Sequence, residues 1–131
     1  MKKTFSILSI IALFLIMTSC DGSVKKTLRD TSHDLNKTLP QTLDKYTVLN
    51  TSTVIDESFM YSYTMDKKFL DDYSISKSYW IENQVSNLTN FYCTDPDFKW
   101  FRDNNINVIW RYNDLNGNHF ETIEINRSDC N

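Results

Sequence analysis

Residues 106–126 constrain the fold most strongly, because their side chains alternate between apolar and polar at period two. The apolar positions of the first half are Ile106, Val108, Trp110 and Tyr112. The dipeptide Asn116-Gly117 follows, which accepts the positive φ angles of a type I′ turn. His119 to Ile125 supplies a return strand of similar character. The segment therefore predicts an antiparallel β-hairpin.

Two further segments also alternate at period two. Residues 46–56 are rich in Thr and Val, and residues 58–65 alternate aromatic or Met side chains with Ser and Thr. This pattern is typical of half-buried strands, and we expect the two segments to pair as antiparallel neighbours.

Helical spacing appears in the segments on either side of this pair. An amphipathic helix is predicted from Val24 to Leu39, closed by Pro40 because the residue before a proline leaves helical geometry. Its expected stripe is Val24, Leu28, Thr31, Leu35 and Leu39. A second helix is predicted over 75–92, with its expected stripe at Ile81, Val85, Leu88 and Tyr92. Asp95 is a good N-cap for a short helix that starts at Pro96 and runs to about Arg102.

The order of these elements predicts an α+β fold. We expect an N-terminal helix and a central helix packed on a roughly four-stranded antiparallel sheet, with the C-terminal β-hairpin and one disulfide.

The N-terminal segment predicts export. Lys2-Lys3 precede a 13-residue apolar run from Phe5 to Met17, which is too short for a comfortable bilayer span. The small residues Thr18-Ser19 and then Cys20 follow. This segment resembles the lipobox of bacterial lipoproteins, although Met17 stands where Leu is most common. The resemblance implies cleavage before Cys20, whose thiol accepts a diacylglycerol and whose new amine is acylated, so that the chain is anchored to a membrane.

The expected organisation is then a cleaved signal over residues 1–19, a lipidated N-terminus and short tether over 20–23, and one periplasm-facing domain over 24–131. Two alternatives are a plain cleaved signal with an incidental cysteine and an uncleaved membrane helix.

The other two cysteines, Cys93 and Cys130, predict a disulfide, because an exported chain meets an oxidising compartment. Neither has a nearby His or second Cys, so we expect no metal site.

Charge and composition exclude several functions. The chain has 14 basic and 17 acidic residues, and removing Lys2 and Lys3 leaves 12 basic residues and a net charge of about −5. An acidic domain without a basic block argues against nucleic acid. Gly22 and Gly117 are the only glycines, so no loop can cradle a nucleotide. No nucleophile motif frames a serine, and His33 and His119 have no ligand-spaced partner. We therefore expect no catalytic residues and no cofactor.

The abundant aromatic side chains suggest a binding surface. Adjacent aromatic positions on one helix cannot all face inward, so Trp80 and Trp100 are candidates for a partner-binding patch. Burial in the core is the alternative for both.

Several segments carry a resemblance to known proteins: residues 36–40 with Asp44 and Thr47, Tyr61-Ser62-Tyr63, Tyr92-Cys93-Thr94, residues 105–112, Gly117 and Cys130. They resemble an uncharacterised family of small bacterial lipoproteins with a Tyr-Cys…Cys C-terminal hairpin. More distantly, they resemble the α/β class of type II secretion pilotins, which have a helix on a four-stranded antiparallel sheet.

The pilotin resemblance implies a carrier function. Such a lipoprotein binds a short segment at the end of a secretin subunit, folds it as a helix in an apolar groove, and directs it to the outer membrane through its own lipid. Asp21 favours the inner membrane instead, because aspartate after the lipidated cysteine tends to retain lipoproteins there in enteric bacteria. The alternative function is a periplasmic inhibitor, or an immunity or exclusion lipoprotein, acting against a toxin, a hydrolase or a phage. A protruding acidic loop around Asp71-Asp72 would favour that alternative.

Overall fold

The computed structural model describes residues 22–131. The predicted export segment, Cys20 and Asp21 lie outside the described residues. Within residues 22–131, no helix combines the length and the apolar character needed to cross a bilayer.

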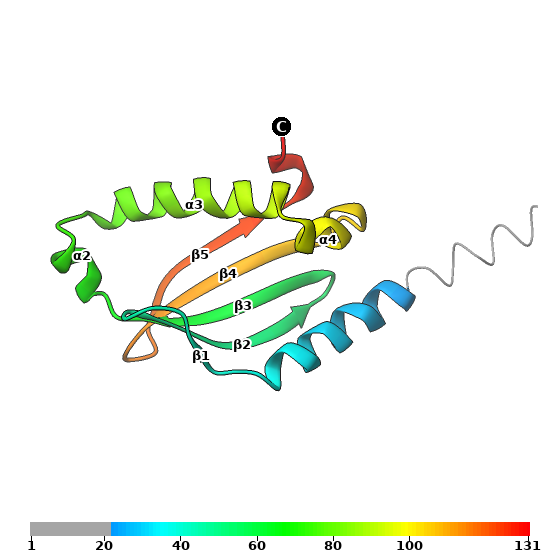
Figure 1. The fold of residues 1–131 in the computed structure, drawn as a ribbon, viewed down its shortest axis with the longest axis horizontal. Coiled ribbons are helices and arrows are strands. Elements are labelled where there is room, and N and C mark those ends of the chain that lie inside the picture. The colour runs from blue at the N-terminus through cyan, green and yellow to red at the C-terminus, as the bar shows by residue number, and fades with distance from the viewer. Residues whose placement is uncertain (1–21) are drawn as a thin grey trace, which may run out of the picture.

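The described chain folds as a five-stranded sheet with helices on it, which confirms the α+β fold class (Figure 1). A first helix over residues 22–36 precedes the sheet. The remaining elements, in chain order, are β1 (Gln41–Thr42), β2 (Thr47–Ile55), β3 (Ser58–Met65), α2 (Lys68–Asp72), α3 (Lys77–Thr94), η1 (Pro96–Phe98), α4 (Lys99–Asp103), β4 (Asn107–Asp114), β5 (His119–Ile125) and η2 (Arg127–Asp129).

The strands lie in chain order, β1-β2-β3-β4-β5. The predicted antiparallel pair is β2 and β3, and the predicted C-terminal hairpin is β4 and β5. The sheet adds the two-residue strand β1 at its edge, and β3 pairs with β4 in parallel. A parallel pair needs a long crossover connection, and α3 supplies it.

The first helix packs on one face of the sheet. Ser32 Oγ lies 2.9 Å from Ser52 Oγ of β2, and both residues are buried. Ser52 stands opposite Tyr61 of β3, which in turn stands beside Trp110 of β4. Cross-strand partners share a face of the sheet, so these residues identify the face that the first helix covers.

Helix α3 covers the same face. Tyr63 lies two residues from Tyr61 and therefore on the same side, and its neighbour in β4 is Tyr112. The Tyr112 ring contacts Trp80 of α3 at 5.1 Å between centroids. The core lies between this face and the helices, and its buried apolar residues are Leu28, Leu49, Phe59, Tyr63, Met65, Phe69, Tyr92, Phe98, Phe101, Ile106, Val108, Trp110, Tyr112, Phe120, Ile123 and Ile125.

Three local expectations are corrected. The first helix buries Ser32 rather than Thr31, because Ser32 meets Ser52. Val85 of α3 is exposed, while Trp80 packs toward the sheet. In the C-terminal hairpin, Gly117 has φ of 80° but Asn116 is not at positive φ, so the turn is not type I′.

Asp114 explains the different turn. Its backbone carbonyl accepts the Gly117 N–H at 3.0 Å, and its carboxylate accepts the N–H groups of Asn116 and Asn118, each at 2.9 Å. Lys67 adds an ion pair at 3.2 Å. The hairpin therefore closes through a three-residue loop with Gly117 in the left-handed region.

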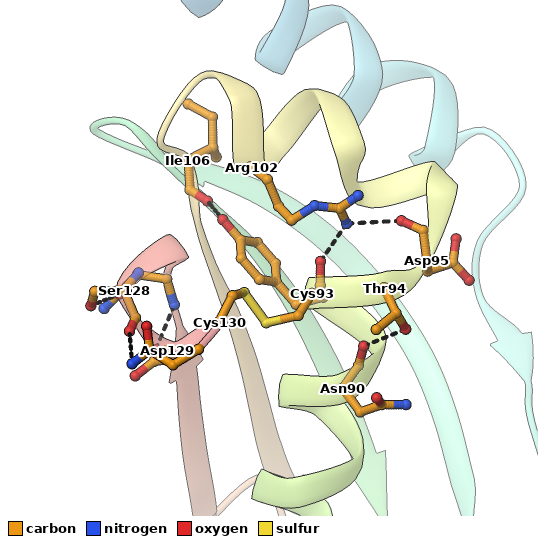
Figure 2. The surroundings of a disulfide bond; sticks show 12 residues. Asn90, Cys93, Thr94, Asp95, Arg102, Ile106, Ser128, Asp129 and Cys130 are labelled. Carbon is orange, nitrogen blue, oxygen red and sulfur yellow. Dashed lines mark hydrogen bonds between the residues drawn. A yellow bond between two sulfur atoms is a disulfide. The ribbon is translucent and has the colours of Figure 1, made fainter.

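The disulfide predicted between Cys93 and Cys130 is present, with 5.4 Å between the Cα atoms (Figure 2). It joins the end of α3 to the tail that follows β5. Arg102 donates to the backbone carbonyls of Tyr92 at 2.6 Å and of Asp95 at 2.9 Å. The last turn of α3 is therefore held by a covalent bond and by charge-assisted hydrogen bonds.

The free edge of β2 is closed by one side chain at the end of the first helix. Asn36 donates to the carbonyl oxygen of Ser52 at 3.0 Å and accepts the N–H of Ser52 at 2.7 Å. These are the two backbone bonds that a neighbouring strand would make, supplied where β1 no longer pairs with β2.

Asn36→Ala should lower the free energy of unfolding by about 1–3 kcal/mol, because the N–H and carbonyl of Ser52 lose their partners. Urea denaturation measures this change. The matched control is Asn87→Ala, an exposed asparagine in the interior of α3, which should leave stability unchanged or slightly higher. Equal behaviour of the two variants would contradict the role of Asn36.

Replacing Cys93 and Cys130 together by Ala should lower the free energy of unfolding by roughly 4 kcal/mol, because the bond closes a long loop in the unfolded chain. The cysteines are 37 residues apart. Denaturation of the oxidised protein and the double variant gives the difference. A loss below about 1 kcal/mol would contradict stabilisation of the fold through restriction of the unfolded chain.

Candidate functional site: an aromatic groove beside α3

Two adjoining recesses lie over the sheet beside α3 and share Tyr63. We call them together the groove. The larger recess has a volume of about 470 Å³ and is lined by residues 43–47, Tyr63, Met65, Phe69, Tyr73, Trp80, Gln84, Leu88 and Tyr112. The smaller recess has a volume of about 260 Å³ and is lined by Tyr61, Tyr63, Phe91, Asp97, Phe98, Phe101 and Trp110.

The floor of the groove consists of aromatic pairs from the parallel strands β3 and β4. Tyr61 stacks on Trp110 with 6.0 Å between centroids, and Tyr63 stacks on Tyr112 with 4.9 Å. The parallel register places each of these pairs side by side on one face. Such stacking adds about 0.5–1.5 kcal/mol per pair beyond area burial, so the floor is a rigid surface.

Helix α3 forms one wall of the larger recess. Trp80 meets Tyr112 nearly edge-on, and Gln84 donates to the Tyr112 hydroxyl at 3.2 Å. Leu88, one turn further along, lines the same recess. These residues are spaced by four, so they form one stripe along the helix.

The opposite rim is the loop between β1 and β2. Tyr46 Oη donates to Asp72 at 2.6 Å, and its ring contacts Tyr73 at 5.8 Å between centroids. Lys45 Nζ lies 3.9 Å from Asp72 and 5.0 Å from the Tyr46 ring centroid. The rim is therefore tied to α2, while Leu43 is left 51% exposed and Tyr73 65% exposed.

The tyrosine hydroxyl groups on the floor of the groove stay neutral at physiological pH. Burial raises the pKa of Tyr61 and of Tyr112 to about 12, and it also raises the pKa of Tyr63. A neutral aromatic surface with a few hydroxyl groups suits an apolar chain segment that also presents hydrogen-bonding groups.

The structure separates the two tryptophans expected to bind a partner. Trp80 lines the larger recess, and its ring also contacts Phe69 and Phe120. Trp100 lines neither recess, and its ring contacts that of Phe101. The two do not form one patch in the described structure.

The groove also contains residues that the sequence analysis did not single out, above all Leu43, Tyr73 and Phe91. Leu43 lies in an irregular loop and Tyr73 just after a short helix, where no periodicity marks them. Phe91 directly precedes the buried Tyr92 in α3. Because adjacent helical residues face different directions, the sequence alone could have indicated that the Phe91 ring faces outward.

The acidic pair Asp71-Asp72 lies at the end of α2 and not on a protruding loop. Asp72 is engaged by Tyr46 and Lys45. Among residues 22–131, no group of three His, Cys, Asp or Glu side chains could hold a metal ion. His33 lines a separate shallow recess, and His119 contacts Thr122 in its own strand.

Tyr46→Phe should raise the pKa of Asp72. The hydrogen bond from Tyr46 is the main reason why that pKa lies below its ordinary value. A depressed carboxyl pKa stabilises the fold above the pKa of the unfolded chain, and the effect is lost as pH falls through the folded pKa. The stability difference between wild type and variant should therefore shrink on acidification.

Carboxyl ¹³C NMR titration checks this prediction directly. The control is Asp103, whose pKa is lowered by its hydrogen bond from Lys99 and should not change in the variant. An unchanged Asp72 titration would show that Tyr46 does not engage it in solution.

The chain matches no protein-family model, and no curated protein matches it in sequence. Three solved structures share its fold. The Pseudomonas aeruginosa protein PA3611, provisionally described as secreted, has a TM-score of 0.73 at 11% identity, over 85% of this chain and 96% of its own. The Vibrio vulnificus type 2 secretion pilotin EpsS has a TM-score of 0.67 at 10% identity, over 83% and 93%. The Vibrio cholerae type II secretion pilotin AspS has a TM-score of 0.66 at 11% identity, over 87% and 98%. At these identities the likeness shows the fold, and the fold is that of known pilotins.

Proposed function

We propose that this chain is a pilotin-like carrier whose groove binds a short apolar helical segment of an envelope secretion protein. The observation that carries the proposal is the groove itself, an aromatic recess over the sheet whose rim residues Leu43 and Tyr73 are exposed to solvent. Exposed apolar surface of this kind costs solubility unless a partner covers it.

The shape of the groove fits one face of a short helix. It runs beside β3 from Tyr61 to Met65, a distance of about 13 Å. About nine residues of α-helix span that length. Apolar side chains spaced by three and four on such a helix would rest on the stacked Tyr and Trp rings.

The shared fold supports the same proposal. Two of the solved structures with this fold are pilotins of type II secretion systems. The proposed mechanism is carriage without catalysis: the groove binds the segment, and the lipid on Cys20 determines the membrane to which the complex travels. The proposed location is the bacterial cell envelope, with the domain facing the periplasm, and Asp21 favours the inner membrane.

The inhibitor alternative receives no specific support from the described residues. Its expected feature was a protruding acidic loop, whereas Asp72 is held against the rim of the groove by Tyr46. We therefore keep the carrier as the one proposed function.

A pull-down of the tagged lipoprotein from its own bacterium, followed by mass spectrometry, tests the proposal. Wild type should capture a secretin or another secretion-system subunit. Leu43→Glu places a charge on the groove rim and should reduce the captured amount at least tenfold, because an apolar segment cannot pair that charge. The matched control is Leu115→Glu, in the β4–β5 turn, which lines neither recess; its side chain is 66% exposed and capture should be unchanged.

Two results would contradict the carrier function. One is capture of a toxin, hydrolase or phage protein in place of a secretion subunit. The other is equal capture of the secretion subunit by wild type and Leu43→Glu, which would place the binding site outside the groove.

A further inference from the structure

The smaller recess differs from the rest of the groove by combining aromatic rings with a single charge. Six of its lining residues are aromatic, and Asp97 is the only charged one. The larger recess, by contrast, has charges of both signs at its rim, from Asp44 and Lys45.

The rings of the smaller recess are set at angles to one another. Phe91 meets Phe98 at 4.9 Å between centroids with 70° between planes, and Phe98 meets Trp110 at 6.2 Å with 46°. Phe98 and Trp110 are buried, while Phe91 is 45% exposed at the mouth. The buried rings pack against one another, so the rings open to a ligand are the partly exposed Phe91 and Tyr61, and a cation can rest on the face of such a ring.

The carboxylate of Asp97 has no partner within residues 22–131. It forms no ion pair and accepts no hydrogen bond there, although its backbone N–H donates to Asp95 at 2.8 Å. Burial is the main cause of the raised pKa of Tyr61, and the charge of Asp97, which lines the same recess, adds to it.

The cations nearest to Asp97 in the chain are engaged elsewhere. Lys99 pairs with Asp103, and Arg102 donates to the carbonyls of Tyr92 and Asp95. Asp97 is exposed at the mouth of the recess, so its negative charge is accessible to a ligand.

We propose that the smaller recess binds a cationic side chain, of the arginine type, carried by the segment that occupies the groove. This inference rests on the proposed function for the identity of the occupant. A planar guanidinium stacks on aromatic faces and also pairs with a carboxylate, so it satisfies both features of the recess. A carboxylate or phosphate ligand would meet repulsion from Asp97 and from the ring faces.

The test uses the domain alone with two small probes, so its result does not depend on capturing a partner. N-acetyl-arginine N-methylamide and N-acetyl-citrulline N-methylamide have nearly the same shape and differ in charge. NMR titration follows the indole N–H of Trp110 and the ring signals of Phe91. The arginine probe should bind about threefold to tenfold more tightly than the citrulline probe.

Two variants assign the preference to the recess. Asp97→Asn, and separately Phe91→Leu, should reduce the affinity for the arginine probe to that for citrulline. The matched control Asp71→Asn, an exposed carboxylate on α2, should change nothing. Unchanged amide signals outside the recess confirm that each variant is folded.

Three results would overturn the inference: equal binding of the two probes, full arginine preference in Asp97→Asn, or tighter binding of choline than of the arginine probe at the same resonances. The last result would assign the recess to a quaternary ammonium group instead of a side chain. None of these results bears on whether the groove captures a secretion subunit, because the pull-down tests that proposal separately.

Discussion

The fold depends on how the C-terminal end of α3 is fixed to the sheet. Tyr92 is completely buried, and its hydroxyl donates to the carbonyl of Ile106 at 2.8 Å, just before β4 begins. The neighbouring Cys93 is bonded to Cys130, so the same helical turn is tied to both strands of the hairpin. Because α3 is the connection between the parallel strands β3 and β4, these contacts determine where the helix lies over the sheet.

The groove is a consequence of that placement. One end of α3 is fixed at Tyr92, and the other packs through Trp80 against Tyr112 and Phe120. The helix therefore lies over the same face of the sheet as the stacked tyrosines, and the two recesses open along its side. The floor residues Tyr63, Trp110 and Tyr112 belong to the buried core, so the groove keeps its shape before any partner arrives. Preorganisation of this kind reduces the entropy that binding must overcome.

Much of the fold could be predicted from the sequence. Period-two alternation located β2–β5, and helical spacing located the first helix and α3. The Cys93–Cys130 bond was predicted because the chain is expected to be exported to an oxidising compartment. The parallel pairing of β3 with β4 could not be predicted, because alternation marks a strand but not its neighbour. The strand β1 has only two residues, too few to show any period.

The candidate site was less predictable. Trp80 was singled out and does line the groove, but Trp100 was singled out by the same argument and does not. Adjacent aromatics show that some ring must face outward, yet they do not show which rings share a surface. Tyr61 and Tyr112 have the pattern of core residues, and only the register between strands places them on the floor of a groove. The rim residues Leu43 and Tyr73 lie where the chain is irregular.

The central claim is that the groove is occupied by a secretion-system subunit in the cell. The most direct measurement is photocrosslinking in the living bacterium, with p-benzoylphenylalanine in place of Tyr73, a rim residue that is 65% exposed. Occupancy of the groove predicts a crosslink to an apolar helical segment of one secretion subunit, and none from the same group at Thr53, an exposed position of β2 outside the groove. A crosslink from Tyr73 to a toxin, a hydrolase or a phage protein would contradict it, as would a secretion-subunit crosslink that appears only at Thr53.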